Sequence, residues 1–180
     1  MGGLLTAPGR LLHRLRRRAA RQALKDRAPR SILVLCHGNI CRSPFAAALL
    51  LRALGPLGVR VDSAGFGRPN RAAPPEAVAA AARRGVDLAD HRSRLLTPDL
   101  ARWAELIVVM DPVQQRDVRE RFGRASSDVV VLGDLDPAPL GGARAIRDPI
   151  GQGPDVFEAS YARIERCVAG VVSVLGGEAR

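Results

Sequence analysis

Residues 31–44 have the sequence Ser-Ile-Leu-Val-Leu-Cys-His-Gly-Asn-Ile-Cys-Arg-Ser-Pro, and they are the starting point for predicting the architecture of this 180-residue chain. The first five residues form a short apolar run, which is typical of a strand buried on both faces of a sheet. A turn containing glycine follows, and Pro44 stands in the first turn of a helix, where proline is tolerated. We therefore expect a strand, a tight loop and a helix that runs to about Leu54.

The rest of the chain alternates between apolar runs and helical patterns. Further strands are expected at 59–61, 105–110 and 128–132, and helices at 75–84, 113–122 and 155–174, with a short helix from Pro98 and a loop over 133–154. Such alternation implies parallel strands joined by right-handed crossovers. The predicted fold class is α/β: a three-layer sandwich with a four-stranded parallel sheet, flavodoxin-like, preceded by a basic N-terminal helix. In such sheets ligands bind beyond the carboxyl ends of the strands, where the loop after the first strand lies.

Positive charge is concentrated at the N-terminus. Residues 1–30 carry nine basic side chains and one acid, a net charge of +8, whereas the rest of the chain carries 19 basic and 17 acidic groups. We expect a helix over 10–27 that has on one face Leu11, Leu12, Leu15, Ala19 and Ala23. The chain thus divides into a basic N-terminal extension, 1–30, and a domain, 31–180. The extension is compatible with an anionic membrane, a nucleic acid or an acidic partner, and equally with a solvated, partly disordered segment.

The cysteine count and the hydropathy of the chain indicate an intracellular protein. Three cysteines are too few for a disulfide scaffold and indicate reactive or buried thiols. No apolar run approaches the roughly 20 residues that span a bilayer, and the basic N-terminus lacks the apolar segment of a secretory signal. We expect a cytoplasmic monomer that needs no metal and no cofactor.

The turn from Cys36 to Ser43 has the composition of an anion site. Cys36 and Arg42 are separated by five residues, and Ser43 follows. Backbone N–H groups in a tight turn that leads into a helix form a cradle for an anion, and Gly38 and Asn39 tolerate the conformations that such a turn needs. Arg42 can bind two phosphate oxygens at once, and the same positive field favours a Cys36 thiolate. A lone cysteine at a strand end is more often a small buried hydrophobe, but this context favours a nucleophile.

An ordered set of short motifs resembles one known family. Residues 36–44, Cys-His-Gly-Asn-Ile-Cys-Arg-Ser-Pro, resemble the phosphate loop of the low-molecular-weight protein tyrosine phosphatases. The resemblance extends over about 31–175 and includes Asp62-Ser63-Ala64-Gly65, Gly85-Val86-Asp87-Leu88, His91-Arg92-Ser93-Arg94, Met110-Asp111 and Asp148-Pro149. Residues 1–30 lie outside it.

The resemblance implies hydrolysis of protein tyrosine phosphate, or of a small aryl phosphate, through a phosphocysteine intermediate. Cys36 would attack phosphorus, Arg42 would bind the phosphate, and Asp148 would act as general acid and then as general base. The phosphate would be bound by His37, Gly38, Asn39, Ile40, Cys41, Arg42 and Ser43.

The same resemblance assigns supporting roles. The phosphate loop would be held by Asn39, Ser43, Ser63 and His91, although His91 is equally well explained as an exposed residue near a helix start. Cys41 would be a reversible redox partner of Cys36, or would simply fill space. Cys167 is expected in the core.

Two departures from the family pattern bear on the substrate. Tyrosine phosphatases of the family place aromatic side chains at the pocket mouth, whereas here Ile150 follows Asp148-Pro149, and residues 66–69 contain one aromatic residue, Phe66. Relatives that hydrolyse phosphoarginine typically carry threonine at the position of Ile40, so the isoleucine favours phosphotyrosine. The alternatives are a protein arginine phosphatase or another phosphomonoesterase on this scaffold, and a non-catalytic phosphate-binding module or tether that acts through the basic arm.

Overall fold

The computed structural model describes residues 7–138 and 143–176. Its elements, in chain order, are α1 (Ala7–Arg27), β1 (Ser31–Cys36), α2 (Arg42–Leu54), η1 (Gly55–Leu57), β2 (Arg60–Gly65), α3 (Pro75–Ala82), α4 (Pro98–Trp103), β3 (Leu106–Val109), α5 (Pro112–Phe122), η2 (Ser126–Asp128), β4 (Val129–Val131), η3 (Leu132–Leu135) and α6 (Pro154–Leu175). Every predicted strand and helix is present, with shifted ends. Residues 1–6 of the predicted extension, 139–142 of the predicted loop and 177–180 lie outside the described residues.

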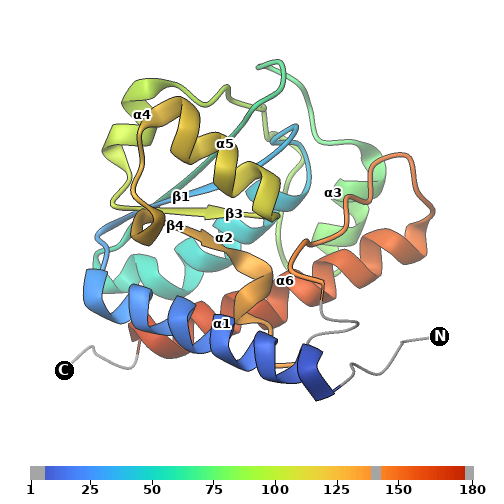
Figure 1. Cartoon of the computed structure of the whole chain (residues 1–180). Helices are drawn as coiled ribbons and strands as arrows, with labels where there is room; N and C mark the ends of the chain where they lie inside the picture. The colour runs from blue at the N-terminus through green and yellow to red at the C-terminus, as the bar shows by residue number, and fades with distance from the viewer. Residues whose placement is uncertain (1–6, 139–142, 177–180) are drawn as a thin grey trace.

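Four parallel strands form one sheet in the order β2-β1-β3-β4 (Figure 1). Val34 of the central strand β1 lies opposite Ser63 of β2 on one side and Val108 of β3 on the other. Helices α4 and α5 cover one face of the sheet, and α2 and α6 cover the other. The predicted three-layer α/β fold is confirmed. Because all strands run in one direction, their carboxyl ends meet at one edge of the sheet, where β1 ends at Cys36.

Strand β2 is longer than its side-chain pattern predicted. The apolar pattern covered 59–61, whereas the strand spans Arg60–Gly65, and its buried carboxyl half, Ser63-Ala64-Gly65, pairs residue by residue with the end of β1. Pairing with a central neighbour extends this strand beyond the point where side chains alone would end it. Ser63 and Gly65 are thereby brought to the edge of the sheet at which Cys36 lies.

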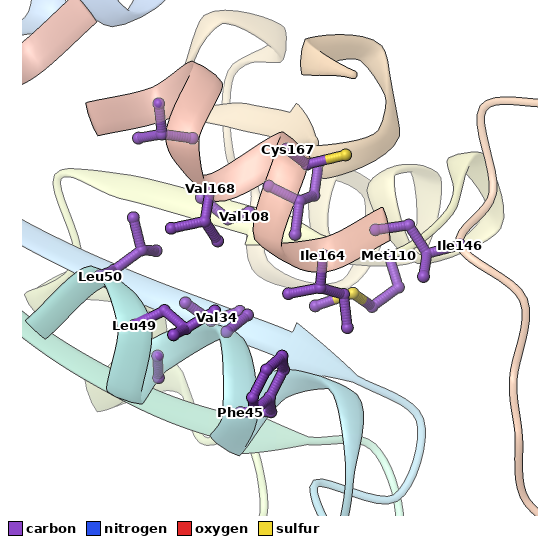
Figure 2. Packing of buried hydrophobic residues seen from close by; sticks show 14 of the residues in the cluster. Val34, Phe45, Leu49, Leu50, Val108, Met110, Ile146, Ile164, Cys167 and Val168 are labelled. Carbon is purple, nitrogen blue, oxygen red and sulfur yellow. The ribbon is translucent and has the colours of Figure 1, made fainter. Parts of the chain in front are cut away.

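The larger of two apolar clusters lies between the sheet and helices α2 and α6. Val34 of β1, Leu50 of α2 and Val168 of α6 are among its members (Figure 2). Cys167 is fully buried in the same cluster, as the sequence predicted. This layer fixes α2 against the central strand, so the loop that joins them has two rigid ends.

An aromatic stack ties the start of α2 to α6. The rings of Phe45 and Tyr161 lie nearly parallel, 5° apart in orientation, with centroids separated by 4.1 Å. Such pairs contribute roughly 0.5–1.5 kcal/mol beyond the burial of their area. The hydroxyl of Tyr161 also donates a hydrogen bond to the carbonyl oxygen of Cys41 at 3.3 Å. Helix α6 therefore holds the end of α2 that carries Arg42.

Helix α1 lies across the outside of α6 and η3 (Figure 1). Ala20 and Leu24 are buried in the main cluster. The buried ring of His13 donates from Nε2 to the carbonyl oxygen of Asp136 at 2.9 Å. The side of α1 that packs against the domain thus includes a histidine. A search for apolar residues alone does not identify this side.

The leucine face expected from the sequence is not the face that packs. Leu11, Leu12 and Leu15 are exposed. None of the helices within 7–138 and 143–176 combines the length and the hydropathy that a membrane span requires. The division of the chain into 1–30 and 31–180 stays a prediction.

Candidate active site

The candidate site is the phosphate loop, Cys36–Ser43, which joins β1 to α2. Cys36 is the last residue of β1 and Arg42 is the first of α2. Asn39 adopts a positive φ of 49°, which asparagine tolerates better than most residues. Gly65, at the end of β2, approaches so closely that a Cβ atom there would lie 2.8 Å from two carbonyl oxygens of the loop. The loop is therefore confined between β2 and its own helix.

The N-terminus of α2 is open to an anion. Its N-cap residue, Cys41, makes no side-chain capping hydrogen bond within the described part of the chain, and the first turn contains no acid. The side chains of Thr97 and Asp111 cap α4 and α5, whereas α3 and α6, like α2, have no side-chain cap within the described residues. Free N–H groups at a helix start carry partial positive charge and favour an anion. A phosphate in the loop would satisfy the groups that side chains satisfy in α4 and α5.

The thiol of Cys36 lies at the floor of the loop. Its Sγ is 3.0 Å from the Oγ of Ser43, and the side chain is buried. The sulfur thus lies beside a hydroxyl group, in the loop that leads into α2. Burial and then the neighbouring Cys36 raise the pKa of the Cys41 thiol from 9.0 to about 12. Of these two cysteines, Cys36 is the candidate nucleophile, and Cys41 remains a neutral thiol near pH 7.

Arg42 and Asp148 are distant in sequence and paired in space. The guanidinium of Arg42 forms an ion pair with the carboxylate of Asp148 and donates from Nη1 to the carbonyl oxygen of Ile146 at 3.0 Å. The buried Nε of Arg42 has no hydrogen-bond partner among the described residues. The Arg42 side chain is 4% exposed and that of Asp148 45%. The ion pair thus extends from the floor of the loop to the protein surface. A phosphate in the loop could accept a hydrogen bond from Nε of Arg42 and replace Asp148 as the partner of the guanidinium.

Asn39 is the centre of the four predicted loop-supporting residues, and the other three all contact it. Its Nδ2 donates to the Oγ atoms of Ser43 and Ser63, each at 2.9 Å. Nε2 of His91 donates to the Asn39 carbonyl oxygen at 2.7 Å. A contact that the sequence did not predict comes from the backbone N–H of Arg94, which donates to Oδ1 of Asn39 at 2.8 Å. One side chain therefore joins the loop to β2 and to the segment 91–94.

A second unpredicted support comes from main-chain atoms. The backbone N–H groups of Phe66 and Gly67 both donate to the carbonyl oxygen of His37 at 2.9 Å. Such contacts leave no signal in side-chain chemistry. The glycine at position 65, in the Ser-Ala-Gly motif, is the one sequence feature that could have indicated a close approach.

The loop that carries Asp148 is anchored on two elements. The N–H of Ile146 donates to the carbonyl oxygen of Met110, just after β3, at 2.8 Å. On the other side, Oγ of Ser160 in α6 donates to the carbonyl oxygen of Arg147 at 2.9 Å. These anchors bring residue 148 to the loop after β1, although more than a hundred residues separate them. The sequence indicated Met110 only as part of a short motif and did not indicate Ser160.

The remaining predicted residues lie around the loop with different exposures. His37 is exposed and Ile40 is buried. Phe66 is partly buried against the second core cluster, with the guanidinium of Arg121 5.8 Å from its ring centroid. Ile150, next to Asp148-Pro149, is 40% exposed. Phe66 therefore packs into the domain, and Ile150 offers an aliphatic surface beside the site.

The arrangement can bind an oxyanion, present a sulfur nucleophile and transfer a proton. Arg42 and the start of α2 supply positive charge, Cys36 the sulfur and Asp148 the carboxyl group. No three His, Cys, Asp or Glu side chains within the described ranges are grouped so that they could hold a metal ion.

Comparison with known proteins assigns the chain to a family. A sequence model described as low molecular weight phosphotyrosine protein phosphatase matches residues 31–179. The chain belongs to this family. One relative is the protein named probable low molecular weight protein-tyrosine-phosphatase EpsP of Ralstonia solanacearum, which is 40% identical over 140 residues that cover 77% of this chain and 91% of EpsP. The family predicted from the motifs is confirmed.

Solved structures of low molecular weight phosphatases match the fold. The tyrosine phosphatase Wzb from Escherichia coli K30, in complex with sulphate, has a TM-score of 0.74 and 30% identity, and the match covers 82% of this chain and 99% of Wzb. The YwlE arginine phosphatase from Geobacillus stearothermophilus has a TM-score of 0.73 and 32% identity, over 83% of this chain and 95% of YwlE. The low molecular weight phosphatases similar to this chain thus include proteins named for either substrate.

Proposed function

We propose that this protein hydrolyses phosphotyrosine in proteins through a phosphocysteine intermediate. The observation that carries the proposal is the grouping of Cys36, Arg42 and Asp148 at one helix N-terminus that lacks a side-chain cap within the described residues. A nucleophile, a cation that holds the phosphate and a carboxyl group that moves protons are the parts that phosphoryl transfer to sulfur and then to water requires.

In the first step, the phosphate replaces Asp148 on the guanidinium of Arg42 and accepts hydrogen bonds from the N–H groups of residues 37–43. The Cys36 thiolate attacks phosphorus in line. A phosphorus–sulfur bond forms as the bond from phosphorus to the tyrosine oxygen breaks, and protonated Asp148 gives its proton to that oxygen. Tyrosine leaves as a neutral phenol, which avoids expulsion of a phenolate.

In the second step, the Asp148 carboxylate takes a proton from water, and the water oxygen attacks phosphorus. The phosphorus–sulfur bond breaks, phosphate is released and the Cys36 thiolate is restored. The hydroxyl of Ser43, whose Oγ is 3.0 Å from Sγ, donates to the departing sulfur. This donor stabilises negative charge on sulfur and so speeds the step in which the thiolate leaves.

Ile40 supports tyrosine as the phosphorylated residue. Its buried side chain fills the place at which relatives that hydrolyse phosphoarginine typically carry a smaller threonine. The aliphatic surface of Ile150 gives less stacking to a tyrosine ring than an aromatic side chain would, by roughly 0.5–1.5 kcal/mol per aromatic pair. Since relatives are named for both activities, phosphoarginine is the second candidate substrate.

A substrate panel tests the proposal. An aryl phosphate and peptides with phosphotyrosine, phosphoserine or phosphoarginine would be offered to the wild type, Cys36→Ser, Asp148→Asn and the control Asp99→Asn, a strongly exposed aspartate. We expect cleavage of the aryl phosphate and phosphotyrosine, no turnover by Cys36→Ser, and a loss of about 10²–10⁴-fold in Asp148→Asn. Retained turnover by Cys36→Ser would rule out the mechanism. Faster release of phosphate from phosphoarginine would favour the second candidate.

We propose further that the protein acts in the cytoplasm as a monomer. Three cysteines are too few for a disulfide scaffold, which fits a protein that folds in a reducing compartment. Size-exclusion chromatography with light scattering would test the monomer, and a dimer mass at micromolar concentration would contradict it.

A further inference from the structure

The outer face of α1 carries an apolar patch. Leu11, Leu12 and Leu15 are 60%, 47% and 57% exposed. Spacings of three and four residues make them neighbours on a helix surface. Leu11 and Leu15 point roughly 160–200° around the helix axis from the buried His13, as follows from 3.6 residues per turn. The patch therefore lies on the side of α1 that faces away from the domain.

A stripe of basic side chains borders the leucine patch. Arg10, Arg14, Arg18 and Lys25 are exposed, and their spacings of four and seven residues place them along one side of the helix, next to the leucines. Residues 7–27 carry eight basic side chains and one acid, a net charge of +7, whereas the chain after residue 30 has a net charge of +2. Most of the net positive charge of the protein thus lies on the helix that carries the exposed leucines.

We propose that this face of α1 binds the surface of an anionic lipid membrane. Leucines on the outer face would enter the boundary between headgroups and acyl chains, while the arginines remain with the lipid phosphates. A nucleic acid or an acidic protein segment would engage the arginines but leave Leu11, Leu12 and Leu15 in water. Because both kinds of side chain are exposed next to one another on α1, an anionic membrane surface is the partner that covers all of them.

Membrane contact through α1 would also orient the catalytic domain, because the helix is fixed to it. Leu24 is buried, His13 donates to the Asp136 carbonyl oxygen, and Arg27 forms an ion pair with Asp128. Asp128 precedes β4 and Asp136 follows it, so α1 runs antiparallel to the strands (Figure 1). The leucine patch is in the half of α1 nearest the sheet edge that carries the phosphate loop. Bound protein would hold this edge close to phosphoproteins at the same membrane.

Vesicle flotation with the full-length protein tests this proposal. The probes are vesicles of phosphatidylcholine alone and of an equal mixture of phosphatidylcholine and phosphatidylglycerol. We expect binding to the mixed vesicles only, weakened by salt. Leu11→Gln/Leu15→Gln should reduce the partition coefficient about tenfold or more, since apolar burial is lost. Glutamine keeps a helix propensity close to that of leucine.

The matched control is Leu51→Gln/Leu57→Gln, which alters two leucines outside α1 that are 49% and 45% exposed. It should bind as the wild type does, and Arg14→Gln/Arg18→Gln should lose binding. Hydrolysis of an aryl phosphate should be equal in all these proteins, so the vesicle result is independent of the proposed catalysis. The proposal is overturned if anionic vesicles are not bound, if the α1 leucine variant binds undiminished, or if duplex DNA or polyglutamate is bound and vesicles are not.

Discussion

Replacing Asn39 with alanine tests whether the hydrogen bonds around this side chain hold the phosphate loop in shape. Asn39 is fully buried, and its side chain makes three hydrogen bonds of 2.8–2.9 Å, to Ser43, Ser63 and the backbone of Arg94. A net value of about 0.5–1.5 kcal/mol for each gives a loss of roughly 1.5–4.5 kcal/mol in the free energy of unfolding. The positive φ adds about 1–2 kcal/mol, because alanine tolerates it poorly.

Asn70→Ala separates these two contributions. Asn70 also has a positive φ, 59°, but it is exposed and its side chain makes no hydrogen bond within the described residues. Urea unfolding should therefore show a loss of only about 1–2 kcal/mol for Asn70→Ala. In hydrolysis of an aryl phosphate, Asn39→Ala should lower kcat/KM about tenfold or more, since a shift of the reacting groups by 1 Å costs about 10²-fold in rate. Asn70→Ala should keep a kcat/KM near that of the wild type. Equal effects of the two changes, on stability and on rate, would refute the reasoning.

Three further perturbations test other parts of the site and core. Gly65→Ala should lower kcat on an aryl phosphate about tenfold, because the new Cβ would lie 2.8 Å from backbone atoms of the phosphate loop. The control Gly176→Ala should leave kcat unchanged, since the nearest atom to its new Cβ would be 3.6 Å away. Equal kcat values for the two variants would contradict the close approach of Gly65 to the loop. Asp148→Ala should lower kcat but strengthen inhibition by inorganic phosphate severalfold, because Arg42 then has no carboxylate partner that phosphate must displace. Weaker inhibition would show that Asp148 does not compete with phosphate for Arg42. Burial raises the pKa of Cys167 from 9.0 to about 12, so the unfolded state loses the proton first and the free energy of unfolding should fall between pH 9 and 12. In urea titrations between pH 9 and 12, the free energy of unfolding should fall less for Cys167→Ala than for the wild type. An equal fall in the two proteins would show that the Cys167 thiol is not its cause.

The sheet and the phosphate loop were predictable because their signals are local. The run before Cys36, the glycine after it and Pro44 lie within 14 consecutive residues, and buried strands, tight turns and helix starts each have a recognisable composition. The partners of the loop were less predictable. Arg94 and Met110 take part through backbone atoms, which every residue has, so nothing in their side chains indicates the contact.

Helix α1 shows why a hydropathy pattern does not reveal which face of a helix packs. The leucines form the more apolar face, but the domain offers α1 a carbonyl oxygen at Asp136 as well as apolar atoms. His13 can satisfy that oxygen while Leu24 fills the space further along, and a leucine face would leave the oxygen buried without a donor. The choice depends on the surface of α6 and η3, which is assembled only in the folded chain.

The rigid and the exchangeable parts of the candidate site come from different elements. Asn39 is fully buried and bonded to two other segments, and Gly65 leaves the loop no space, so the anion cradle is fixed before any ligand arrives. Asp148 is 45% exposed and held at the loop by its ion pair with Arg42. A phosphate that binds Arg42 removes this attachment, whereas Ile146 and Arg147 stay anchored through their backbone atoms. In the proposed mechanism, proton transfer therefore requires only rotation of the Asp148 carboxylate on an anchored segment, and the loop that would position phosphorus need not move.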